Sequence, residues 1–88
     1  MKKILFFQLR FCGHCRKARK LLDSLLAEND AYQNIEIEHV DEGVERERAK
    51  AYDYFYVPTF YVNEQKVHEG PVSREQLEDI LKMALAEA

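Results

Sequence analysis

The sequence predicts an α/β fold, a four-stranded mixed sheet flanked by helices, with its elements in the order β-α-β-α-β-β-α. Short apolar runs alternate with segments whose apolar residues recur every three or four positions, which indicates strands alternating with helices. The first β-α-β unit predicts two parallel strands joined by a right-handed crossover, and a later hairpin adds antiparallel strands. Because the chain has 88 residues, we expect one domain covering residues 1–88.

The first half of the chain contains two predicted strands and one long helix. Residues 4–7 form a continuous apolar run, which is typical of a short strand buried on both faces. From Gly13 the apolar residues recur with the period of a helix, which we expect to end near Asn29. Its apolar face consists of Ala18, Leu21, Leu22, Leu25 and Leu26. Apolar and acidic residues then alternate over residues 35–40, which predicts a second strand with one exposed face.

The middle of the chain is predicted to hold a second helix and a hairpin. Residues 44–54 are predicted to form a helix, because their acidic residues lie near the start of the segment, where a helix N-terminus favours them. The apolar face is weak and consists of Val44, Ala51, Tyr52 and Phe55. Residues 57–62 and 66–69 lie on either side of the polar stretch 63–65, which indicates a β-hairpin.

The last helix has a clear start signal. Ser73 and Gln76 have the spacing of a capping box, in which each side chain accepts a backbone N–H of the other residue. Val72 and Leu77 occupy the positions of a hydrophobic staple. The apolar face that follows consists of Leu77, Ile80, Leu81, Ala84 and Leu85.

Charge is unevenly distributed along the chain. Residues 1–20 carry a net charge of +7 and no acid, whereas the remaining residues carry −10, which gives a total of −3. The basic excess either creates a positive field around the N-terminal chemistry or is a solvated helix face. The net negative charge argues against nucleic-acid binding, and no apolar run approaches the roughly 18 residues of a membrane span.

Two cysteines lie close together in the tetrad Cys12-Gly13-His14-Cys15, between the first strand and the first helix. The nucleophile in disulfide exchange is the thiolate, and an ordinary cysteine, with a pKa of about 8.5, is mostly protonated near pH 7. The free N–H groups and partial positive charge at a helix N-terminus favour the anion. We therefore expect Cys12 to be the attacking thiolate and Cys15, one turn inside the helix, to be the resolving thiol.

Neighbouring cations are expected to adjust the redox pair. His14, if protonated or donating a hydrogen bond, stabilises the Cys12 thiolate. Arg10 and Arg16 act in the same direction. A more stable thiolate stabilises the reduced form and makes the disulfide a better oxidant.

A CxxC pair also occurs in metal sites. Structural zinc needs four ligands, and two of His14, His39 and His68 could in principle join Cys12 and Cys15. However, the sequence has no second CxxC and no HxxxH pair, and His39 and His68 fall in predicted strands, where we expect surface residues. We therefore expect neither a bound metal nor a cofactor.

The chain resembles the thioredoxin-like superfamily over nearly its whole length. Three features carry the resemblance: Phe11-Cys12-Gly13-His14-Cys15, with a tetrad typical of protein disulfide isomerase domains, Val57-Pro58-Thr59, and Gly70-Pro71-Val72-Ser73. The resemblance implies a thioredoxin fold. It also implies that Pro58 is cis, packs against the active-site sulfurs and leaves the Val57 backbone free to pair with an extended substrate. The residues expected to contact substrate are Phe11, Gly13, Val57, Pro58 and Thr59.

The sequence departs from related families at two places. Thioredoxins and disulfide isomerase domains carry a buried acid six residues before the first cysteine, as a proton acceptor for the resolving thiol, and here that residue is Phe6. Proton transfer from Cys15 must then use water, His14 or another group. Glutaredoxins carry Pro-Tyr between the cysteines and a basic residue three positions before the first, where this chain has Gly13-His14 and Leu9. This second departure argues against glutathione binding.

Aromatic residues are concentrated around Pro58. They form either an apolar docking rim for protein substrates or part of the core. We expect Phe55 and Phe60 in the core, and the sequence leaves Tyr54 and Tyr56 undecided between the two.

Together these features predict a thiol–disulfide oxidoreductase that acts on protein disulfides or dithiols through Cys12 and Cys15. The alternatives are a glutathione-dependent glutaredoxin, a CxxC metal-binding module, and an interaction domain without turnover, against which the intact cysteine pair argues. The N-terminal apolar stretch is too short for a signal peptide, so we expect a cytoplasmic protein, and we expect a monomer. The expected reductant is a thioredoxin-reductase-type enzyme or glutathione.

Overall fold

The computed structural model describes residues 2–86 and has the predicted element order with one additional 3-10 helix. The strands are β1 (Ile4–Gln8), β2 (Ile37–Asp41), β3 (Thr59–Val62) and β4 (Gln65–Glu69). The helices are α1 (Gly13–Glu28), α2 (Arg46–Lys50) and α3 (Arg74–Leu85), and the 3-10 helix is η1 (Asp30–Asn34).

The four strands form one mixed sheet, as predicted, and their order in it is β2-β1-β3-β4. Strand β1 runs parallel to β2 and antiparallel to β3, and β4 completes the hairpin at the edge. Phe7 pairs with Val40 on one side and with Thr59 on the other. The residues that follow β1 and those that precede β3 therefore meet at the same end of the sheet.

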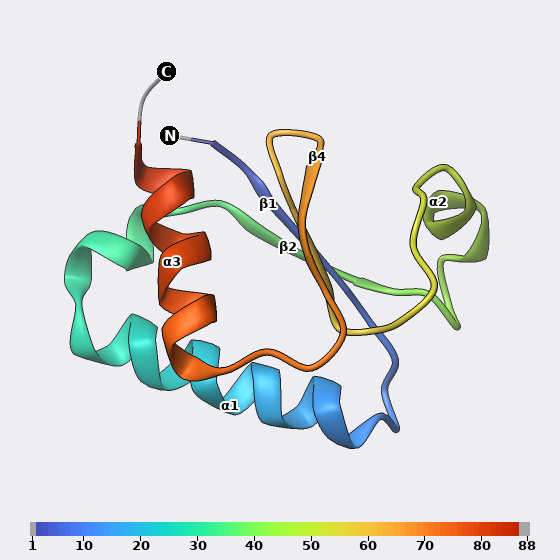
Figure 1. Ribbon diagram of the computed structural model, residues 1–88, viewed down its shortest axis with the longest axis horizontal. Helices are drawn as coiled ribbons and strands as arrows, with labels where there is room; N and C mark the ends of the chain where they lie inside the picture. Colours follow the sequence, from blue (N-terminus) through green and yellow to red (C-terminus); the bar gives the residue numbers. More distant parts are fainter. Residues whose placement is uncertain (1, 87–88) are drawn as a thin grey trace.

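The helices cover the sheet on two faces (Figure 1). Ile4 and Phe6 of β1 belong to the larger core cluster, which includes the buried faces of α1 and α3. Leu5 and Phe7 belong to a smaller cluster on the opposite face, which includes Ala49 of α2. All five residues of β1 are buried, so the prediction of a strand buried on both faces is confirmed.

The two long helices follow their sequence signals. Helix α1 begins at Gly13 and ends at Glu28, close to the predicted end. At the start of α3 the capping box is complete, because Ser73 Oγ accepts from the Gln76 N–H at 3.1 Å and Gln76 Oε1 accepts from the Ser73 N–H at 3.0 Å. Val72 and Leu77, the predicted staple pair, are both buried in the larger cluster.

The prediction for the second helix is wrong in length and in its apolar face. Helix α2 covers five residues, and Val44 and Phe55, expected on its buried face, are 80% and 85% exposed. The chain leaves the helix because the Tyr52 and Tyr54 rings pack on Phe7, each with ring centroids 4.9 Å apart. These contacts require residues 52–54 to run along the sheet rather than continue a helix.

The hairpin is tighter than predicted. The turn consists of Asn63 and Glu64, both with positive φ, which is the backbone geometry that joins two antiparallel strands through two residues. Gln65, expected in the turn, begins β4, and β3 begins at Thr59, so Val57 and Pro58 precede the strand. In the described residues, no helix is both long and apolar enough to cross a membrane.

Candidate active site

The tetrad Cys12-Gly13-His14-Cys15 lies at the junction of β1 and α1. Cys12 is the N-cap of α1, and its sulfur accepts a hydrogen bond from the Cys15 backbone N–H at 3.4 Å. The Cys12 carbonyl accepts from the Arg16 N–H at 2.9 Å, which closes the first turn. A sulfur therefore occupies the place usually taken by a capping oxygen, and it satisfies one of the free donors of the helix.

The environment of Cys12 favours the thiolate. Partial burial alone would raise the pKa of Cys12. Hydrogen bonds from the Cys15 side chain and backbone and from the His14 backbone N–H, together with the charge of Arg19, outweigh burial and lower this pKa below its ordinary value of 9.0. His14 is exposed, and its contribution to the lowered pKa of Cys12 comes from its backbone N–H.

Cys15 has the opposite environment. Its side chain is fully buried at the start of α1. Burial, together with the hydrogen bond to Cys12 and the charge of Cys12, raises the pKa of Cys15 to about 12, although the Leu9 backbone and Arg19 act against the shift. One cysteine is therefore accessible and acidic, while the other is buried and protonated, as expected for an attacking and a resolving thiol.

The segment before β3 brings a second group to the sulfur. The Val57–Pro58 peptide bond is cis, as the resemblance implied, and Pro58 is fully buried. Cys12 Sγ lies 4.0 Å from the Val57 carbonyl oxygen, at the limit of a thiol hydrogen bond. Thr59 is buried, and its hydroxyl donates to the Tyr56 carbonyl. Two of the expected substrate residues, Val57 and Pro58, thus lie beside Cys12.

Two further expected substrate residues, Phe11 and Gly13, adjoin Cys12 along the chain. Phe11 is 90% exposed, and a Cβ added to the exposed Gly13 would meet no atom within 4 Å beyond its chain neighbours and its own helix backbone. Phe11 also lines a hollow of about 330 Å³ with Leu9 and Val44. Arg10, Asp41 and Gly43 complete the lining, so the hollow combines three hydrophobic side chains with one basic and one acidic side chain.

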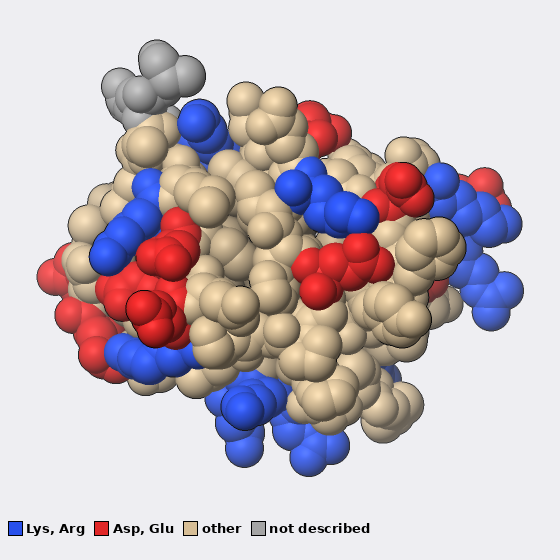
Figure 2. All heavy atoms as spheres, viewed as in Figure 1, with Lys and Arg blue, Asp and Glu red and all other residues tan. Residues whose placement is uncertain are grey.

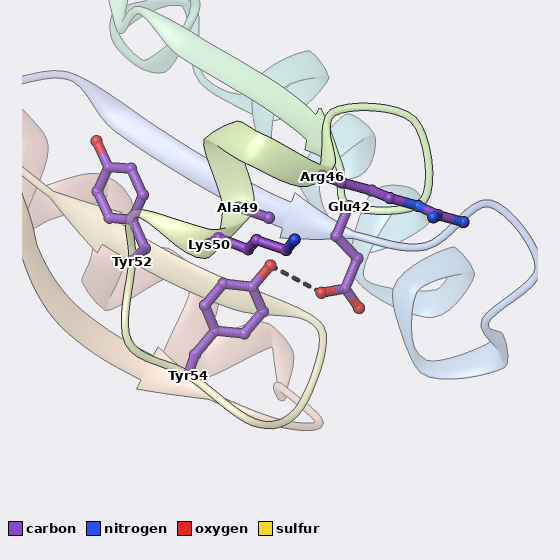
Figure 3. Close-up of a pocket in the computed structure, with 6 residues that line it drawn as sticks. All are labelled: Glu42, Arg46, Ala49, Lys50, Tyr52 and Tyr54. Carbon is purple, nitrogen blue, oxygen red and sulfur yellow. Dashed lines mark hydrogen bonds between the residues drawn. The ribbon is translucent and has the colours of Figure 1, made fainter.

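The aromatic residues near Pro58 divide between core and surface. Phe60 is buried, as expected, but Phe55 is 85% exposed, so the prediction that it belongs to the core is wrong. Tyr56 is also exposed. Tyr54 is half-buried, and its hydroxyl donates to Glu42 at 2.8 Å across a second hollow next to α2, as Figure 3 shows.

Glu69 holds the segment that presents these side chains. Its carboxylate accepts from the backbone N–H groups of Phe55 and Tyr56 and from Lys66 Nζ at 2.8 Å. Lys66 and the two N–H groups lower the pKa of Glu69 to about 2. Sequence reasoning missed this role, because an acid on one strand that binds a loop 13 residues earlier leaves no local pattern.

A polar chain lies next to the pair on the other side. Arg19 donates to Gln8 Oε1 at 2.7 Å, and Gln8 Nε2 bonds His39 Nδ1 at 2.9 Å. Gln8 is buried at the end of β1. Arg19 was not singled out in the sequence, although its position four residues after Cys15 on the same helix places it one turn away.

The histidines do not join the cysteines in a metal site. His39 bonds Gln8, and His68 bonds the Pro71 carbonyl oxygen at 2.8 Å. Within residues 2–86, no group of three or more His, Cys, Asp or Glu side chains is arranged to hold a metal ion. The four-ligand zinc alternative therefore lacks its ligands in this part of the chain.

Comparison with known protein families agrees with this geometry. The profile of the thioredoxin family matches residues 2–84. The chain belongs to the thioredoxin family. The family supports a thiol–disulfide oxidoreductase as the general kind of activity.

Solved structures of thioredoxins share the fold. Malassezia sympodialis thioredoxin aligns with a TM-score of 0.77 at 18% identity over 97% of this chain and 76% of its own. Plasmodium falciparum thioredoxin aligns with a TM-score of 0.73 at 19% identity, over 97% of this chain and 82% of its own. Schistosoma mansoni thioredoxin aligns with a TM-score of 0.72 at 25% identity, over 93% of this chain and 77% of its own. A comparison with curated protein sequences finds no match.

Phe6 stands at the position where the resemblance to thioredoxins implies a buried acid. It is fully buried and packs on Phe60 with ring centroids 4.5 Å apart. The interior is therefore apolar at this position.

We expect iodoacetamide to label Cys12 well before Cys15 near neutral pH. The labelling rate of Cys12 should reach half its maximum below pH 9.0, because only the thiolate reacts and the pKa of Cys12 is lowered. Mass spectrometry of peptides after limited alkylation over a pH series measures both rates. The Cys12→Ser variant is the control and should react slowly throughout. Faster labelling of Cys15 would reverse the two assigned roles.

Replacement of Glu69 should have a pH-dependent effect on stability. The depressed pKa of Glu69 means that its ionised form stabilises the fold above pH 4.5, and this contribution is lost as the pH falls towards 2. Glu69→Gln should therefore lower the free energy of unfolding at pH 6, and the difference from the parent should shrink by pH 3. Urea denaturation of both proteins at pH 6 and pH 3 measures the difference in the free energy of unfolding. Glu47→Gln is the control, because Glu47 is 92% exposed and such pairs contribute little. An equal loss for Glu69→Gln at both pH values would contradict the role assigned to the carboxylate.

Proposed function

We propose that this chain reduces disulfide bonds of protein partners, with Cys12 as the attacking thiolate and Cys15 as the resolving thiol. One observation carries the proposal: the Cys12 sulfur caps α1 and is stabilised as an anion, while Cys15 is buried one turn behind it. The intact pair, the exposed neighbours Phe11 and Gly13 and the nearby Val57 carbonyl suit a protein substrate.

The exchange proceeds in two balanced steps. The Cys12 thiolate attacks one sulfur of the partner disulfide, which forms a mixed disulfide and releases the other partner sulfur as a thiolate. Cys15 then loses its proton and attacks the Cys12 sulfur, which forms the Cys12–Cys15 disulfide and releases the second partner thiolate. The partner gains two electrons and, after protonation, two thiols, while the protein becomes oxidised. A dithiol reductase or two molecules of a monothiol such as glutathione return the protein to its reduced form.

The region before Pro58 supports the orientation of the partner. Val57 and Pro58 precede β3, and the Val57 carbonyl faces Cys12. An extended partner segment that pairs with this backbone would bring its disulfide to the sulfur, as in recognition by strand addition. Phe11, next to Cys12, and Phe55 and Tyr56, just before Val57 along the chain, are exposed and offer apolar contacts to a partner.

The reductant is a separate question with its own test. Gly13-His14 and Leu9 stand where glutaredoxins have Pro-Tyr and a basic residue, so we propose reduction by a reductase rather than by glutathione. Reduction of hydroxyethyl disulfide coupled to glutathione should be slow compared with reduction of insulin driven by a dithiol. The cytoplasmic location and the monomeric state stay predictions from the sequence.

We expect Cys15→Ser to trap mixed disulfides with a protein substrate, because no thiol remains to resolve them. Cys12→Ser should abolish exchange, since the nucleophile is lost. Non-reducing electrophoresis after incubation with insulin, followed by mass spectrometry of the adduct, measures both outcomes. Adducts through Cys12 in the first variant and none in the second are expected. Insulin reduction by Cys12→Ser would remove the basis of the proposal.

We expect His14→Pro to make the redox pair more reducing. Proline has no backbone N–H, so this variant loses both the ring and the hydrogen bond that the His14 N–H gives to the Cys12 sulfur. A hydrogen bond to a charged group contributes about 1.5–3 kcal/mol. Because 1.4 kcal/mol corresponds to about 30 mV, the reduction potential should fall by about 30 mV or more.

His14→Ala separates the ring from the backbone, because alanine keeps the N–H. Equilibration with a glutathione buffer gives the potentials of both variants. If His14→Pro and His14→Ala shift the potential equally, the backbone hydrogen bond has no effect and the ring accounts for the change. An unchanged potential in both would exclude residue 14 from the control of Cys12.

A further inference from the structure

Exposed cations lie on the first half of α1, in the turns that follow the Cys12 cap. Arg16, Lys17 and Lys20 are exposed on the first half of the helix, and Arg10 is exposed just before it. In the view of Figure 2, Lys and Arg side chains gather along the lower edge of the molecule, where Figure 1 places α1. We call Arg16, Lys17 and Lys20 the basic face of α1.

The fold gives no reason for cations at this end of the helix. The N-terminus of a helix carries a partial positive charge, so acids are favoured there and cations are disfavoured. Helix α1 has no acid in its first turn and no base in its last, which is the reverse of the stabilising arrangement. Among residues 2–86, none of the three cations of the basic face forms an ion pair.

Of the cations on the first half of α1, Arg19 is the one with a role in the reactivity of the Cys12 sulfur. Arg19, which is half-buried and bonded to Gln8, lowers the pKa of Cys12 by its charge. The side chains of the basic face lie on the solvent side of the same helix, because Cys15, Ala18 and Leu22 occupy the buried side. A cluster that opposes the helix dipole and faces solvent next to a reactive group marks a candidate contact surface.

The apolar hollow begins at the residue before Cys12. Phe11 lines it together with Leu9 and Val44, which is 80% exposed. Arg10, which precedes Phe11, also lines it, and its guanidinium lies 5.4 Å from the centre of the Phe11 ring. We propose that a partner that reaches Cys12 contacts both this hollow and the basic face.

We propose that the physiological partner is a protein whose disulfide lies in an acidic segment, with carboxylates along the basic face of α1 and an apolar side chain in the Phe11–Val44 hollow. This inference rests on the proposed function, because it names the substrate class of the same site. Nucleic acids and lipid surfaces are also anionic, but neither offers a disulfide to Cys12. The remaining 68 residues carry −10, so the basic face is a local feature and attracts an anionic partner in one orientation.

The test uses three disulfide-bonded peptides of one length and one cysteine spacing, flanked by acidic, neutral or basic residues. The second-order rate constant of exchange with the reduced protein is measured by stopped flow at ionic strengths of about 20 mM and about 500 mM. At low salt we expect the acidic peptide to react about tenfold faster than the basic one, since steering by surface charge changes association rates by 10-fold or more. At high salt the ratio should approach one, because screening shortens the range of the field.

Matched charge reversals locate the effect. Lys17→Glu/Lys20→Glu alters the basic face, and Lys50→Glu/Lys82→Glu makes the same change in net charge at exposed sites on α2 and α3. The first variant should lose most of the preference for the acidic peptide, and the second should keep it. Glutamate is a good helix former and suits the first half of a helix, so the first variant should fold, which circular dichroism checks.

The outcomes separate the inference from the function on which it rests. If no peptide reacts, the proposed function fails. If all three react at equal rates at low salt, or if both double variants lose the preference equally, exchange occurs but the basic face does not select the partner. The alkylation rate of Cys12 is followed in every variant, and a change there that accounted for the peptide rates would also overturn the inference.

Discussion

The free backbone N–H groups at the start of α1 are the constraint on which the site depends. They need an acceptor, and the chain supplies the Cys12 sulfur, with the Cys15 N–H at 3.4 Å. Capping of the helix and activation of the nucleophile are therefore the same interaction. Since a thiolate is a better acceptor than a disulfide sulfur, the cap is strongest in the reduced form. The redox equilibrium and the stability of the first turn of α1 are thus linked.

The sheet determines what meets this sulfur. β1 lies in the centre of the sheet, and its last residues pair with both β2 and β3. The pairing of Phe7 with Thr59 brings the start of α1 to the segment before β3, although Cys12 and Val57 are 45 residues apart. Glu69 then fixes that segment from the neighbouring strand by binding two of its backbone N–H groups. The site is assembled from two loops, each anchored by a buried strand.

The sequence correctly predicted the elements that have strong local signals. The prediction failed where contacts across the sheet determine the length of an element. The apolar run of β1, the period of α1 and the capping box at Ser73 and Gln76 are local, and all are present. The length of α2 was wrong because the rings of Tyr52 and Tyr54 pack on Phe7, and periodicity carries no information about that contact.

The same distinction applies to the site. The two cysteines and their unequal environments follow from their spacing at a helix start, so the sequence could indicate them. The exposure of Phe55 could not be predicted from its apolar character, because the backbone N–H of this residue is held by Glu69 from another strand. Arg19 and Gln8 likewise act through a bond between a helix and a strand end. Polar contacts between distant segments have no sequence period and appear only in the folded chain.

Phe6 stands at the position where the resemblance to thioredoxins implies a buried acid, so the proposed reaction needs another acceptor for the proton of Cys15. Burial is the largest cause of the high pKa of Cys15, but its hydrogen bond to Cys12 and the negative charge of that thiolate also raise it. In the proposed reaction Cys12 loses its negative charge when it bonds to the partner, so this charge no longer raises the pKa of Cys15. The partner thiolate released in that step is a base. Under the proposed function, attack on the partner therefore both lowers the cost of ionising Cys15 and releases an acceptor for its proton, without an acid at position 6.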